Sequence, residues 1–471
     1  MLRKGVPEYE SAEEGGSDEG APTDRVPEGH EPDTETPSCR LPLLAKHWTV
    51  LKFFWRNFRA VMVVVWLSSF SGALQSPVVP FFLLQLGMTP VGIGQVGFIT
   101  AMGALFLGPI YGLLMDAKNP YAVVVLSTSL CGLGCLLRGV AVNPTMVYAA
   151  ATVMMLGAPM EPMVMAYICR TQHAFDRAAT VAGFLAQSSA LSLAGKAAYP
   201  MWDAVVRDGL HVQDTMHRYR LVLAACIAPC VAGFVLLAAL WRRQRRSLVS
   251  LTQATHVNRP HRPAPVVYAL VASTIVVKQF ATITTNVLWP LFVRKFFGWE
   301  DTRYSLVLFI SAATSLAAMG CAGTRHVGTF ADPMIAMFIA SLSGVAAFSV
   351  TLESAAHWHS VLAICNVTAL SFVNPCLTAL ACEHMPQHWQ GRSFGITSSL
   401  NGVGAIAANL LATYLFQYFT QSGWLLPLPP SSAPFCISAA LLWVGMATLF
   451  LARRIAVGLD AEAGIQACHR V

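Results

Sequence analysis

Residues 108–121 read GPIYGLLMDAKNPY, and a second apolar run, AVVVLSTSLCGLGCLL, begins at residue 122. One acid, Asp116, and a turn therefore separate two apolar segments. Hydrophobic residues make up 55% of the chain and charged residues only 12%, which is more apolar than a soluble domain needs for its core. Because a bilayer core of about 30 Å is crossed by roughly 20 helical residues, these runs predict an all-α integral membrane protein.

The same length criterion, applied to the whole chain, predicts about twelve membrane spans separated by polar residues, Pro or Gly. They begin near Arg59, Gly92, Tyr121, Thr145, Thr180, Tyr219, Pro265, Tyr304, Ala331, His359, Ser393 and Ala433. A long basic stretch falls after the sixth span. The spans therefore divide into two groups of six.

Five regions follow from this division. The N-terminal residues are acidic, rich in Gly and Pro, and poor in apolar side chains, which predicts a disordered tail. The predicted regions are an acidic tail over 1–57, a six-helix bundle over 58–241, a basic loop over 242–264, a second six-helix bundle over 265–454 and a short tail over 455–471.

The distribution of Lys and Arg predicts the orientation. If the N-terminal tail is cytoplasmic, the loops on that side hold most of the basic residues: Lys46, Lys52, Arg56, Lys118, Arg170, Arg177, Arg242, Arg243, Arg245, Arg246, Arg259, Arg262, Arg325, Arg392, Arg453 and Arg454. Both termini and the basic loop are therefore predicted to be cytoplasmic. The net charge of +7 then indicates anionic membrane lipid as a partner and gives no reason to expect nucleic acid.

Cysteine and histidine patterns give little support to metal or redox chemistry. The chain has 12 cysteines, most of them inside predicted spans, so a disulfide framework is not expected. A polytopic membrane enzyme would need clustered His and carboxylate ligands. Two pairs come near this pattern, His357 with His359 and His384 with His388, but the first are two residues apart and the second flank a proline. We therefore expect no metal, no cofactor and no enzyme activity.

The opening stretch resembles a motif of the major facilitator superfamily, G-x-x-x-D-R/K-x-G-R/K-R/K, which lies between the second and third helices of that family. Gly112, Asp116 and Lys118 match it, whereas residues 117, 119 and 120 depart from it. The resemblance covers about residues 58–454. It implies two pseudo-symmetric six-helix bundles that move a small solute by alternating access.

Two further segments are similar to the family's pattern of an Arg before helices five and eleven. They contain Arg177 with Gly183 and Arg392 with Gly395, and their likeness to each other favours duplicated halves.

The resemblance implies a gating role for Gly112, Asp116, Arg177 and Arg392. Gly108 and Gly112 form a G-x-x-x-G face that allows another helix to approach closely. Asp116 could then meet Arg177, or the positive N-terminal end of the helix that begins near Ser393, only when the cytoplasmic face is closed. The alternative is that Asp116 is a solvated acid at a helix end.

Helices one, four, seven and ten line the central path in this superfamily. On those segments the candidate residues for a substrate or proton path are Gln75, Glu161, Lys278, Asn286, Asn366 and Asn374. An ionisable group inside a span costs about 3 kcal/mol or more, which singles out Lys278 and Glu161. The alternatives are a structurally paired Lys278 and a Glu161 that water reaches through a bend at two prolines.

One branch of this family, the proton-coupled drug antiporters, has motifs in helices four and five that this chain matches only in part. Their helix-four Arg falls on Val153 here, and the helix-five segment LAGKAAYPMW keeps only Gly195 and Pro200 of their motif. The sequence thus predicts a secondary active transporter of a small solute, with protons as the candidate coupling ion. The alternative is a transport-dead receptor or sensor on the same scaffold.

Overall fold

The structure is a computed structural model that describes residues 62–117, 120–157, 177–233, 235–236, 239, 264–324, 329–384, 390–422 and 429–468. All of these residues belong to one compact unit, Leu43–Val471. Within them the chain forms helices and no strand. Each of the twelve predicted spans contains a described helix, so the all-helical expectation is confirmed.

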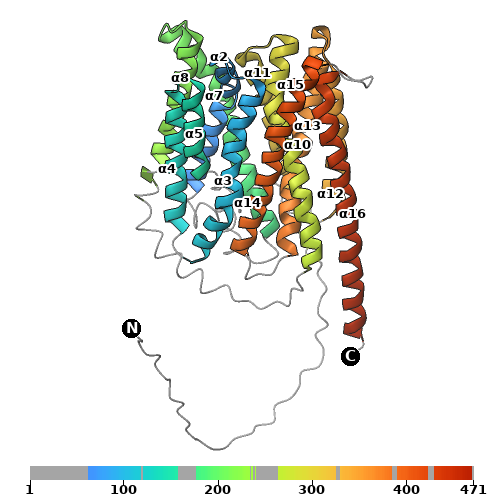
Figure 1. Ribbon diagram of the computed structural model, residues 1–471. Helices are drawn as coiled ribbons and strands as arrows, with labels where there is room; N and C mark the ends of the chain where they lie inside the picture. Colours follow the sequence, from blue (N-terminus) through green and yellow to red (C-terminus); the bar gives the residue numbers. More distant parts are fainter. Residues whose placement is uncertain are drawn as a thin grey trace, which may run out of the picture. The chain divides into compact units, whose positions relative to one another are not determined.

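Helices lie side by side along a common direction (Figure 1). In the first half of the chain they are Met62–Gln75, α2 (Val79–Gln85), α3 (Pro90–Ala117), α4 (Pro120–Gly139), α5 (Pro144–Gly157), α7 (Arg177–Ala204) and α8 (Thr215–Ala225). In the second half they are α10 (Pro265–Phe297), α11 (Asp301–Thr324), α12 (Ala331–Ser349), α13 (Ala356–Glu383), α14 (Gln390–Ala407), α15 (Thr413–Ser422) and α16 (Ala433–Cys468).

Seven described helices are long and apolar enough to cross a membrane. An eighth span is made by Met62–Gln75 and α2, which are bent by 44° at a short break. Large apolar side chains such as Phe106, Leu133, Phe338 and Val444 remain exposed. This is the surface expected of helices that face lipid tails instead of water.

Helix ends follow local chemistry. Prolines open α3, α4, α5 and α10, because a missing backbone N–H costs nothing in the first turn. Gly298 ends α10 in the left-handed conformation, with φ of 62°. Asp214 caps α8 by accepting hydrogen bonds from the backbone N–H groups of Met216 and His217. The His217 side chain also bonds to this carboxylate, and that bond lowers the pKa of Asp214 below its ordinary value.

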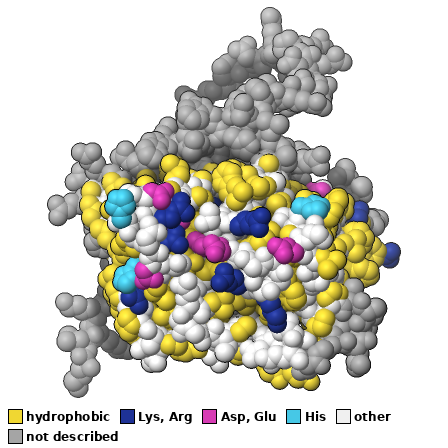
Figure 2. Space-filling view, turned by 90° about the horizontal axis from the view of Figure 1, so that it is seen from above, with side chains coloured by type: hydrophobic (Ala, Val, Ile, Leu, Met, Phe, Trp, Pro, Cys, Tyr) yellow, Lys and Arg dark blue, Asp and Glu magenta, His cyan; other side chains and the backbone are white. Residues whose placement is uncertain are grey.

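We call the end of the bundle that holds residues 205–214 and 298–301 the upper end; it is at the top of Figure 1. Seen from this end, basic, acidic and histidine side chains gather among apolar ones (Figure 2). Beneath them lies a tightly packed aromatic core that includes Phe82, Tyr199, Trp289, Phe292 and Tyr304. Because these residues come from both halves of the chain, the core joins the halves at the upper end.

Two pairs of long contacts connect the halves: α3 lies along α14, and α7 lies along α11. The contact of α3 continues past α14 onto a short π-helical turn, Ala408–Ala412, and onto α15. A π-helical turn inside a long helix widens it by one residue and often marks a functional position. In the second half a separate apolar core fills the space among α10, α12, α13 and α16.

The last helix is longer than its membrane span. α16 runs to Cys468, past residue 454 where the sequence pattern predicts the bundle to end. Its final turns carry residues such as Ala456, Leu459 and Ala461, which favour helix. The region after residue 454, which the sequence pattern predicts as a tail, is therefore helical as far as Cys468.

Candidate functional site

Lys278 lies on α10 and is only 5% exposed. Its Nζ donates a hydrogen bond to Oδ1 of Asn374 on α13, at 2.8 Å. The thirteen residues that separate Lys278 from the start of α10 place it about 20 Å along the helix. The lysine therefore lies inside the bundle, deep in a span, with an uncharged amide among its partners.

A second polar contact joins the same two helices. Thr285 Oγ1 donates to Asn366 Oδ1 at 3.0 Å, and Asn366 Nδ2 donates to the backbone oxygen of Ala340 on α12 at 2.7 Å. Thr285 is seven residues after Lys278, and Asn366 is eight residues before Asn374, as antiparallel helices require. We call the line formed by Lys278–Asn374 and Thr285–Asn366 the α10–α13 seam.

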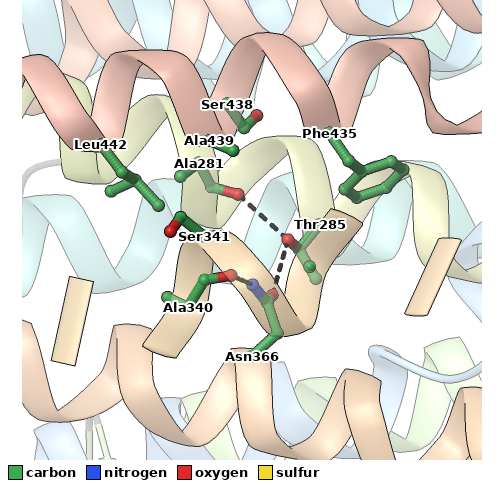
Figure 3. A pocket seen from close by; sticks show the side chains of 10 residues that line it. Ala281, Thr285, Ala340, Ser341, Asn366, Phe435, Ser438, Ala439 and Leu442 are labelled. Atoms are coloured by element: carbon green, nitrogen blue, oxygen red, sulfur yellow. Dashed lines mark hydrogen bonds between the residues drawn. The ribbon is translucent and has the colours of Figure 1, made fainter. Parts of the chain in front are cut away.

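A small cavity opens beside the upper of these contacts (Figure 3). It lies among α10, α12, α13 and α16, and its lining includes Thr285, Asn366, Ser341 and Ser438. The cavity volume is about 10 Å³, which is roughly what one water molecule needs. This cavity is therefore too small for a transported solute.

Of the predicted path residues, three lie on the seam: Lys278, Asn366 and Asn374. Asn286 is exposed instead, because eight helical residues turn the side chain about 80° away from Lys278. Seven residues come within about 20° of two full turns, so Thr285, and not Asn286, lies on the same face of α10 as Lys278. The seven-residue spacing is the signal that could have identified it.

Gln75 lies in the other half of the molecule, at the end of the helix Met62–Gln75. Its amide is half-buried and makes a long contact, 3.7 Å, with Cys135 Sγ on α4. Glu161 is outside the described residues. The side chains of the predicted gating residues Asp116, Arg177 and Arg392, and the surroundings of Gly112, are also outside the described set, so the roles of these four residues stay predictions.

Close packing of α3 against α14 is described at several glycines. A Cβ on Gly108 would lie 3.0 Å from Ser398 and 3.2 Å from the backbone oxygen of Gly395. Ser399 Oγ donates to the backbone oxygen of Leu105 at 2.8 Å. Nearer the upper end, a Cβ on Gly94 would lie only 2.3 Å from the backbone oxygen of Asn409. The two backbones therefore approach each other as closely as small-residue interfaces allow.

At the upper end a buried carboxylate connects the halves. The Tyr199 hydroxyl of α7 donates to Asp301, the first residue of α11, and the Tyr219 hydroxyl of α8 also bonds to this carboxylate. Asp301 is 4% exposed. Close by, Arg218 Nη1 donates to both oxygens of Asp203 at 3.0 and 3.2 Å. We call the contact of Asp301 with Tyr199 and Tyr219 the upper latch.

Histidine geometry does not favour the metal alternative. His359 is fully buried; its Nε2 accepts from Trp289 Nε1 at 3.0 Å, and its Nδ1 lies 2.8 Å from the backbone oxygen of Ala347. Both ring nitrogens are thus engaged, with the proton assigned to Nδ1 by this pattern. His388 lies outside the described residues. Among the residues that the structure covers, no group of three or more His, Cys, Asp or Glu could hold a metal ion.

A bundle of long apolar helices in two halves, joined through glycine-rich contacts and holding a lysine deep in one span, defines a multi-pass membrane transport protein. Residues 61–409 match the family described as Major Facilitator Superfamily. The chain belongs to the major facilitator superfamily of membrane transporters.

Solved structures share this fold. The human organic anion transporter MFSD10 (TETRAN) is 13% identical in sequence, with a TM-score of 0.60; the match covers 84% of this chain and 99% of that one. A bacterial homologue of the iron transporter ferroportin, in an outward-facing state, is 14% identical with a TM-score of 0.59, again over 84% of this chain and 99% of that one. No curated protein matches the sequence significantly.

Proposed function

We propose that this chain moves a small solute with an anionic or hydrogen-bond-accepting group across a membrane by alternating access. The observation that carries the mechanism is the upper latch, because it joins helices of both halves through one buried carboxylate. Contacts of this kind must break when that end of the bundle opens. The upper latch therefore biases the equilibrium between the two access states.

The proposed negative or acceptor group of the solute is inferred from Lys278, the one charged residue of the α10–α13 seam. Lys278 places an ammonium group inside the bundle, where a charge is stable only if it is hydrated, paired or hydrogen-bonded. A solute oxygen could take the place of the Asn374 amide as its acceptor. The shared fold with a protein described as an organic anion transporter is consistent with such a solute.

Proton coupling is the second part of the proposal, and Glu161 is the candidate carrier because a carboxyl group in a span can bind and release a proton. The drug:proton antiporter branch is one form that this coupling could take. A transport-dead receptor on the same scaffold is the alternative function.

The test is a flux measurement in proteoliposomes. Purified protein is reconstituted, and uptake of a panel of labelled organic anions, neutral metabolites and organic cations is measured with and without a pH gradient. We expect uptake of anionic solutes to exceed the uptake by empty vesicles. We also expect uptake to be faster with a pH gradient than without one. Binding of a solute without any flux would support the receptor alternative and contradict the proposal.

The two predicted gates should respond in opposite directions. We propose that both termini are cytoplasmic, so that the upper end faces away from the cytoplasm. Tyr199→Phe removes one bond of the upper latch and should shift the population toward states open at the upper end. Asp116→Asn should weaken the predicted cytoplasmic gate and favour states open to the cytoplasm.

Labelling of single reporter cysteines on each side, by a reagent that does not cross the membrane, measures this shift. Asp208→Asn is a matched control, because Asp208 is an exposed acid at the upper end that pairs only with its neighbour Arg207 among the described residues. Unchanged labelling in Tyr199→Phe would show that the upper latch does not bias access. Unchanged labelling in Asp116→Asn, with transport intact, would favour a solvated acid.

A further inference from the structure

Arg138 lies in the last turn of α4 and is only 7% exposed. Its Nη2 is 3.0 Å from the sulfur of Met154 on α5, which is a weak acceptor. Its Nε has no hydrogen-bond partner. No carboxylate in the described part of the chain forms an ion pair with it. Among the residues that the structure describes, the five N–H donors of this buried guanidinium therefore have one weak acceptor, the Met154 sulfur.

Three thiols lie within electrostatic range of this guanidinium. Cys131 and Cys135 of α4, together with Cys226, are the side chains that interact with it electrostatically. Thiols are weak acceptors and are neutral in their ordinary protonated form. The negative end of α4 also attracts a cation, but this attraction is several times smaller than the cost of removing a guanidinium from water. The arrangement therefore supplies a buried positive charge without a matching negative one.

The first membrane span breaks beside Cys135, which precedes Arg138 by about one turn of α4. Gln75, whose amide contacts Cys135, is the last residue of the helix Met62–Gln75, and the span bends by 44° before α2 begins. In helical transporters, solutes and ions bind where a span is interrupted, because interruption frees polar groups inside the bundle. The break and Arg138 are separate features of the sequence, and the fold connects them through Cys135.

We propose that Arg138 and Gln75 bind an oxyanion group, such as a carboxylate, sulfonate or phosphate, at the break of the first span. The forked guanidinium donates two parallel hydrogen bonds to such a group, and the Gln75 amide donates a third. This site rests on the proposed function in that the oxyanion belongs to the transported solute. A soft metal ion would also suit the thiols, but the guanidinium repels a cation.

Thermal unfolding of the purified protein in detergent tests the site without requiring transport. Sodium sulfate, sodium phosphate and sodium benzoate are titrated against sodium chloride at equal ionic strength. At least one oxyanion should raise the melting temperature of the wild type with a saturable dependence. Arg138→Gln should abolish the saturable part, while any general salt effect remains.

Arg138→Lys keeps the charge but loses the fork, so it should weaken binding by about 10- to 100-fold, the usual effect of losing a charge-assisted hydrogen bond. Gln75→Leu should weaken it less. Arg207→Gln is the matched control: Arg207 is an exposed arginine, and its replacement should leave the titration unchanged.

Three results would overturn the proposal. The first is the absence of a saturable shift in the wild type with all three oxyanions. The second is an equal shift in the wild type and in Arg138→Gln. If Arg138→Gln does not fold, wild-type affinity in both Arg138→Lys and Gln75→Leu would overturn the proposal instead. The third is a loss of stability in Cys135→Ala, without added oxyanion, as large as that in Arg138→Gln, because a thiolate would then be the partner of Arg138. A saturable oxyanion shift without solute flux would instead contradict the proposed transport function and leave this site intact.

Discussion

Lys278→Ala is expected to abolish solute transport while the protein still inserts and folds. The substitution removes the ammonium group from the α10–α13 seam and leaves Asn374 Oδ1 without the donor it has at 2.8 Å. An unsatisfied buried polar atom costs about 1–3 kcal/mol, which a protein of this size survives. A solute group that depends on the ammonium loses its partner entirely. Binding and flux should therefore fall together, by far more than stability does.

Two further variants separate charge from shape at position 278. Lys278→Arg should retain part of the binding if positive charge alone is needed, and Lys278→Met should behave like alanine because it keeps length without charge. Lys295→Ala is the matched control, since Lys295 is an exposed lysine near the end of the same helix. Uptake into proteoliposomes and the size-exclusion profile are measured for each variant. Full transport by Lys278→Ala would show that the seam lysine is structural.

Gly94→Val is expected to produce the largest loss of stability among single substitutions at the contact between the halves. A Cβ there would lie 2.3 Å from both the backbone oxygen of Asn409 and the Thr413 hydroxyl. The Asn409 oxygen belongs to the π-helical turn and cannot rotate away, so α3 and α15 must separate. Overpacking of this kind typically costs about 1–3 kcal/mol and more when backbone must move.

The melting temperature in detergent should accordingly fall by several degrees, or the monodisperse protein should be lost. Gly72→Val is a suitable control, because a Cβ on Gly72 has no neighbour within 4 Å and the substitution adds the same β-branched residue to a helix. Equal melting temperatures for Gly94→Val and Gly72→Val would mean that α3 and α15 do not need to touch. Packing at Gly94 would then have no role in joining the halves.

The sequence by itself determined the membrane class and most helix positions. Predicted spans begin at Pro265, Ala331 and Ala433, where α10, α12 and α16 begin, and near Gly92, two residues inside α3. This agreement has a local cause. Hydropathy, proline at helix starts and glycine at helix ends are properties of neighbouring residues, so they can be read without knowing the fold.

The sequence also singled out Lys278, because an ionisable group in a span is costly wherever the helix packs. It could not supply the partners. The contacts Lys278–Asn374 and Tyr199–Asp301 join residues that are 96 and 102 positions apart. Pairing over such distances depends on which helices become neighbours and on their rotation about their axes, and neither is recorded in local pattern.

Arg138 illustrates the same limit. By position it resembles an ordinary cation at the end of a span, where an arginine side chain can reach the lipid headgroups. Only the tertiary structure places it against Met154 and the thiols, with its Nε unbonded. Hydrophobicity thus decided which segments enter the membrane, whereas the rotation and packing of the helices decided which of their charges are buried, because burial is a property shared by several helices at once.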